Sequence, residues 1–72
     1  MEKILETNAA AERLRKLRQD KNMSAAAVAR EVGISPSALI MYEAGNRTPR
    51  DSIKIKLANY YGQPIGQLFY GQ

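Results

Sequence analysis

The sequence contains no cysteine and no histidine. Without thiols or imidazoles it has no disulfide, no cysteine–histidine zinc site, no thiol nucleophile and no imidazole base. Its longest uncharged apolar stretches, residues 25–29 and 38–42, fall far short of the roughly 20 residues that a membrane helix needs. The first six residues lack the apolar segment of a secretory signal. We therefore expect a cytoplasmic protein with no membrane segment, no metal, no cofactor and no enzymatic activity.

The charge balance favours a polyanionic partner. Eleven Lys and Arg residues against seven Asp and Glu residues give a net charge of +4. A chain of 72 residues forms one domain with a modest core, which leaves no room for a sensor domain, so no small-molecule ligand is expected. A basic surface can also be merely solvated, so the positions of the charges must decide.

Start and stop signals predict helices along the whole chain and no strand, and hence an all-α fold. Residues 1–8 are expected to form an N-terminal arm or an irregular turn, and residues 9–70 the folded domain. A first helix is predicted from the N-cap Asn8 to Asn22, which favours a left-handed stop.

The second and third helices are separated by a very short link. The second is predicted from the N-cap Ser24 to Gly33, and the third from the N-cap Ser35, with proline at its first position, to Gly45. Glycine permits the positive φ of a sharp turn, and Ile34 fills the angle between the helices. Two short helices joined in this way form a helix-turn-helix.

The C-terminal part is predicted to hold two more helices. One begins at the N-cap Thr48, with Asp51 completing a capping box, and ends at Gly62. A short one begins at Pro64 and packs Ile65, Leu68 and Phe69 against the rest. Of the adjacent Tyr60 and Tyr61, one is expected in the core and the other at a dimer contact. The apolar pattern predicts a core of Leu14, Leu17, Val28, Ala29, Val32, Ile34, Leu39, Tyr42, Ile53, Leu57, Leu68 and Phe69.

A run of motif residues carries a family resemblance: Met23-Ser24, Val28-Ala29, Gly33-Ile34-Ser35, Leu39, Tyr42-Glu43, Gly45 and Pro49. In this spacing the chain resembles the Xre-type helix-turn-helix family, which includes phage repressor and Cro proteins, and in particular a short regulator type common in Gram-positive bacteria. The similarity covers about residues 10 to 70. It implies a compact five-helix repressor-like bundle from a bacterium or phage, with the third helix docked in the major groove of double-stranded DNA.

The resemblance also implies roles for individual residues. Arg18 and Glu43 are expected to form a buried structural ion pair. A homodimer through the fifth helix and the C-terminal tail, residues 65–70, is expected to bind operator DNA as a transcriptional regulator, most simply a repressor. Arg47 is expected to contact phosphate, while Lys54 and Lys56 are either DNA contacts or solvated charges. The expected DNA-binding set is Ser24, Ala25, Pro36, Ser37, Ala38, Ile40, Met41, Asn46, Arg47, Thr48 and Arg50.

The third helix departs from the family pattern, which has polar residues where Pro36, Ile40 and Met41 stand. At about 100° per residue, Leu39 and Tyr42 share one face, and Ile40 and Met41 fall on the opposite arc. Exposed apolar residues there leave several options: contact with thymine methyl groups, a hydrogen bond from Ser37, or readout of DNA shape. A second hypothesis keeps the scaffold but lets the apolar face bind a protein, as in an antitoxin or a phage-encoded antagonist.

Overall fold

The computed structural model describes residues 2–71, with side chains described from residue 9 onwards. Its helices are α1 (Glu2–Asp20), α2 (Ala25–Val32), α3 (Pro36–Ala44), α4 (Asp51–Tyr61) and α5 (Ile65–Tyr70). No strand occurs within residues 2–71. The predicted all-α, five-helix fold is therefore confirmed.

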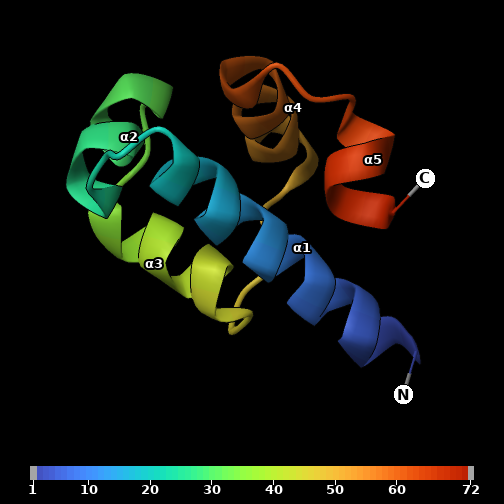
Figure 1. Ribbon diagram of the computed structural model, residues 1–72. Coiled ribbons are helices and arrows are strands. Elements are labelled where there is room, and N and C mark those ends of the chain that lie inside the picture. Colours follow the sequence, from blue (N-terminus) through green and yellow to red (C-terminus); the bar gives the residue numbers. More distant parts are fainter. Residues whose placement is uncertain (1, 72) are drawn as a thin grey trace.

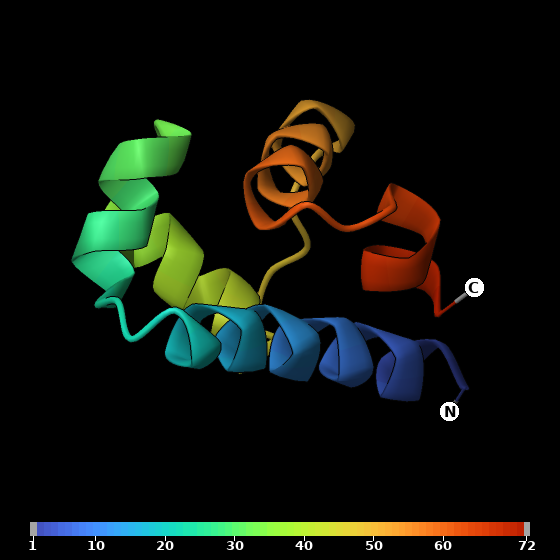
Figure 2. The same cartoon turned by 45° about the horizontal axis from the view of Figure 1, so that its top comes forward.

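The long helix α1 organises the bundle. It packs against α3 and α5, while α2 contacts α3 and α4, and α4 contacts α5 (Figure 1). In Figure 2, α1 lies along the bottom, with α2 above its C-terminal end and α5 above its N-terminal half. The Arg13 guanidinium of α1 donates to the Leu68 carbonyl of α5 at 2.8 Å, so the chain's last helix is tied back to its first.

The predicted apolar core is confirmed. Leu14, Val28, Leu39, Leu57 and Leu68 are almost completely buried, and all five helices contribute to the cluster. Four expected core residues lie half-buried against it: Leu17, Ile34, Tyr42 and Ile53. Two alanines that the pattern did not emphasise, Ala11 and Ala58, are also buried and allow the helices to approach closely.

The ends of α2 and the start of α3 have the predicted capping residues. Ser24 Oγ accepts a hydrogen bond from the Ala27 amide at 3.1 Å, and Ser35 Oγ accepts one from the Ala38 amide at 3.0 Å. Gly33 ends α2 at φ 87°, a conformation that costs a residue with a Cβ about 1–2 kcal/mol. These local signals stop one helix and start the next within three residues, which fixes the helix-turn-helix.

The predicted start of the first helix is wrong. Residues 2–8, expected as an arm or an irregular turn, are helical and continue α1, so Asn8 lies inside a helix rather than at its cap; Met1 lies outside the described residues. Residues 2–20 contain no proline or glycine, and an asparagine inside a helix costs only about 0.7 kcal/mol. The predicted stop is confirmed, because Asn22 has the left-handed φ of 57°.

The predicted start of α4 is also wrong. The helix begins at Asp51, its N-cap is Arg50, and no side chain caps it. Thr48 and Pro49 precede it, and the Pro49 ring is buried, facing the same cavity as Leu14. Burying that ring favours the extended link over a Thr48 cap, whose hydrogen bond is worth about 1 kcal/mol. Asp51 still lies in the first turn, where its negative charge interacts favourably with the positive end of the helix dipole.

Two expectations for the C-terminal side chains need correction. Leu68 and Phe69 are buried, but Ile65, in the first turn of α5, is 37% exposed. Tyr60 and Tyr61 do not divide into a core residue and a surface residue. Both are half-buried against the core, with ring centroids 5.1 Å apart in an edge-to-face arrangement.

Candidate nucleic-acid interface

The outer face of α3 carries the exposed apolar side chains that the helix geometry predicts. Leu39 and Glu43, one turn apart, are buried against the bundle. Ile40 is 55% exposed and Met41 is 42% exposed, and neither belongs to the core cluster. Pro36 and Ser37 are exposed beside them, whereas Ala38 is half-buried.

The start of α2 offers backbone rather than side-chain groups. Ser24 is exposed and its Oγ already accepts from the Ala27 amide, so its hydroxyl hydrogen remains a potential donor. Ala25 is half-buried and packs against the core, so what it can present outward is its amide. Amides in the first turn of a helix have no intrahelical acceptor and are suited to anions.

The link after α3 is the polar part of the surface. Asn46, Arg47, Thr48 and Arg50 are all exposed. Among the side chains of residues 9–71, neither Arg47 nor Arg50 makes an ion pair. Both guanidinium groups are therefore available to an external anion.

The ion pair between Arg18 and Glu43 is present. Arg18 Nε donates to Glu43 Oε2 at 2.8 Å, and Nη2 donates to Oε1 at 2.9 Å. The Arg18 and Glu43 side chains are 18% and 7% exposed. The hydrogen bond to Glu43 raises the pKa of Arg18, which keeps the guanidinium charged.

This ion pair also positions the surface. Arg18 Nη1 donates to the Met23 carbonyl at 2.9 Å, so one guanidinium at the end of α1 holds both the end of α3 and the residue before Ser24. The start of α2 and the link after Glu43 are thereby held at the same end of α3.

Lys54 was expected to be either a DNA contact or a solvated charge, and the structure corrects this. It is 9% exposed, and its Nζ donates to the Tyr70 hydroxyl at 2.7 Å and lies 4.7 Å from the Tyr70 ring centroid. It is therefore not a surface charge available to DNA. Its spacing from Leu57, three residues later, was the signal that places it on the inner face of α4.

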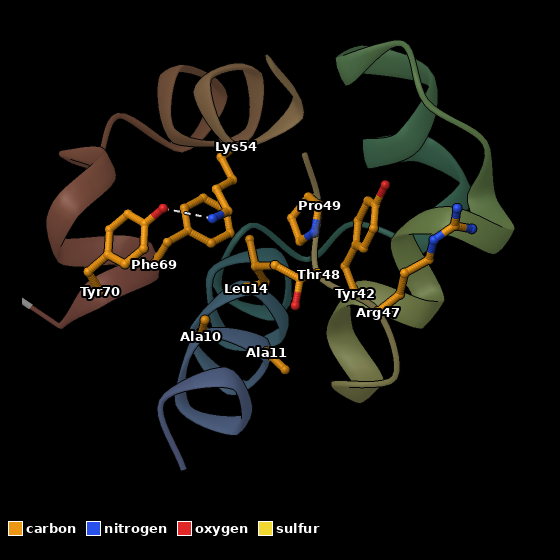
Figure 3. Close-up of a pocket in the computed structure, with 10 residues that line it drawn as sticks. All are labelled: Ala10, Ala11, Leu14, Tyr42, Arg47, Thr48, Pro49, Lys54, Phe69 and Tyr70. Atoms are coloured by element: carbon orange, nitrogen blue, oxygen red, sulfur yellow. Dashed lines mark hydrogen bonds between the residues drawn. The ribbon is translucent and has the colours of Figure 1, made fainter. Parts of the chain in front are cut away.

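Lys54 borders a cavity of about 230 Å³ between α1, the α3–α4 link, α4 and α5 (Figure 3). Its walls are mainly apolar, with Ala10, Leu14, Pro49 and Phe69 among them. Arg47 also borders it, but Figure 3 shows its guanidinium directed away from the other lining side chains. The Arg47 charge thus faces outward.

Comparison with known proteins identifies the fold family. The sequence profile of the family described as Helix-turn-helix matches residues 14–68. The chain belongs to the helix-turn-helix family. This confirms the resemblance to Xre-type helix-turn-helix domains, a family of DNA-binding regulators rather than of enzymes.

The helix-turn-helix protein is also similar to a curated phage protein. It is 32% identical over 56 residues to the cryptic phage CTXphi transcriptional repressor RstR of Vibrio cholerae. The match covers 78% of this chain and 50% of that relative, so the chain spans about half of the relative's length. No solved structure matches the helix-turn-helix protein significantly.

Within the part of the chain that the structure describes, no helix is both long and apolar enough to cross a membrane.

Proposed function

We propose that this helix-turn-helix protein is a transcriptional repressor that binds operator DNA as a homodimer and inserts α3 into the major groove. The observation that carries the proposal is the outer face of α3, which is exposed and is followed along the chain by Arg47 and Arg50, two exposed arginines with no ion-pair partner among the described side chains. The similarity to a phage transcriptional repressor supports the regulatory role.

The side chains divide into two groups in this proposal. Arg47, Arg50 and Ser24, helped by the Ala25 amide and the polar Asn46 and Thr48, contact phosphates and set the position of the protein on the duplex. Pro36, Ser37, Ala38, Ile40 and Met41 meet the base edges in the groove. In this proposal the Arg18–Glu43 pair contacts neither phosphates nor bases, but holds the two groups of side chains in position relative to each other.

The homodimer would use α5. One such module covers only a few base pairs, so a symmetric pair on two half-sites about one DNA turn apart gains both affinity and length of site. Ile65 and Tyr70 leave apolar surface exposed on α5, at 37% and 47%. Sedimentation velocity should show a dimer that Ile65→Asp dissociates while helical content is retained; a monomer at all concentrations would contradict this assignment.

Fluorescence anisotropy with random-sequence duplex DNA over a salt series tests the proposal. We expect binding that weakens steeply with salt, and a log–log slope smaller by about one in Arg47→Ala, because each neutralised phosphate releases counterions. Arg15→Ala, an exposed arginine on α1, is the matched control and should keep the wild-type slope. An equal change in both variants would remove Arg47 from the interface.

A second candidate function is favoured by one observation, the exposure of Ile40 and Met41. The same face could bind a protein, as in an antitoxin or an antagonist of another regulator. Absence of DNA binding even at about 50 mM salt, where electrostatic binding is much stronger than at physiological salt, would favour this candidate.

A further inference from the structure

The exposed face of α3 lacks the side chains that usually identify bases. Direct readout in the major groove relies on bidentate groups, chiefly Arg or Lys on guanine and Asn or Gln on adenine. None of these residue types occurs in residues 36–44. The one charged residue of α3, Glu43, is buried in the ion pair with Arg18. Ser37 is the only fully exposed hydrogen-bonding side chain on the helix.

Apolar groups take the place of the missing polar ones. Ser37, Ile40 and Met41 are separated by three and four positions, so they lie next to each other on one face of α3. This face presents a single hydroxyl beside two large apolar side chains. In the major groove, the only apolar group that the four bases display is the methyl at C5 of thymine.

We propose that Ile40 and Met41 recognise the C5 methyl group of pyrimidines in the major groove, and that the protein therefore accepts 5-methylcytosine as well as thymine at the contacted positions. This inference rests on the proposed function and names what that surface recognises.

The equivalence of the two bases follows from Ser37. Thymine presents an oxygen acceptor at C4, and cytosine and 5-methylcytosine present an amino donor there. A hydroxyl can donate or accept, so Ser37 satisfies either group. What then distinguishes the bases is the methyl group, which thymine and 5-methylcytosine carry on the same ring carbon and cytosine lacks. Cytosine methylation within a site becomes a signal that increases affinity.

The experiment starts from a duplex that the protein enriches from a random-sequence library. Its thymines are replaced by deoxyuridine, which removes only the methyl groups, and the Kd is measured by anisotropy at fixed salt. We expect the Kd to rise about fourfold for each contacted methyl group that is lost. At a contacted position, a C·G pair should weaken binding and 5-methylcytosine paired with guanine should restore it.

The variant Ile40→Ala/Met41→Ala separates methyl contact from changes in DNA shape. Both side chains are exposed and lie outside the core, so the variant keeps the fold, and it should bind the thymine and deoxyuridine duplexes equally. Ile55→Ala, at a 52% exposed position on α4, is the matched control and should retain the full preference.

Three results would overturn the inference. Equal affinity of the wild type for thymine and deoxyuridine duplexes, with salt-dependent binding intact, would refute methyl recognition and leave the proposed function standing. Retention of the preference in the double variant would assign it to DNA shape. Failure to bind any duplex at about 50 mM salt would overturn the inference together with the proposed function.

Discussion

Glu43→Ala should strongly destabilise the protein, because it strands the Arg18 guanidinium. The substitution removes the acceptor of the bonds at 2.8 and 2.9 Å and leaves a charge on a side chain that is 18% exposed. Breaking a buried ion pair by deleting one partner costs about 3–5 kcal/mol. Arg18 keeps its bond to the Met23 carbonyl and some access to water, so we expect a value near 3 kcal/mol. That is a large part of the roughly 4–11 kcal/mol available to a chain of 72 residues.

Urea unfolding followed by circular dichroism measures this loss. With a slope of about 1 kcal/mol per molar for so small a domain, the midpoint should fall by roughly 3 M, or the variant should be unfolded before urea is added. Glu12→Ala, which truncates an exposed glutamate on α1, is the matched control and should change stability by less than about 0.5 kcal/mol. A loss below about 1 kcal/mol in Glu43→Ala would refute the structural role of the pair.

Three further substitutions test other parts of the structure. Burial raises the pKa of Tyr61 to about 12, and its hydroxyl has no hydrogen-bond partner among the described residues. The folded state disfavours the phenolate, so the free energy of unfolding is unaffected by this group below its unfolded pKa of about 10. It falls as the pH rises from 10 towards 12, where the unfolded chain loses the proton first. Tyr61→Phe should be at least as stable as the wild type at pH 7 and lose less stability than it between pH 10 and 12; equal losses in alkaline urea melts would contradict this. Gly33→Ala should cost about 1–2 kcal/mol in the same melts, because nothing lies within 4 Å of the added Cβ and only the positive φ opposes it. Lys54→Met should leave the salt dependence of DNA binding unchanged, because the buried ammonium contacts Tyr70 rather than the surface; a smaller slope would place it at the DNA.

Short-range chemistry made the helix-turn-helix predictable from the sequence. Ser24 and Ser35 each cap a helix by accepting a hydrogen bond from the amide three residues later. Gly33 and Gly45 end helices by adopting a positive φ, so no distant residue has to be known. The outward position of Ile40 and Met41 followed from helical periodicity alone.

The parts that could not be predicted depend on distant contacts. Thr48 and Asp51 form a plausible capping box, but burial of Pro49 beside α1 moves the start of α4 to Asp51. Lys54 is a surface residue by type, yet the hydroxyl and ring of Tyr70, sixteen positions later, make its burial tolerable. The spacing from Leu57 places Lys54 on the inner face of α4, but its partner there lies on α5 and does not follow from that spacing.

The central claim, that the outer face of α3 meets DNA, is tested most directly by an NMR titration of the isotope-labelled protein with duplex DNA at low salt. The account predicts that the largest amide shifts fall on Ser24, Ser37, Ile40, Met41 and Arg47, with little change in α5 once the dimer is formed. Shifts centred on α4 or α5, or none at all, would contradict it.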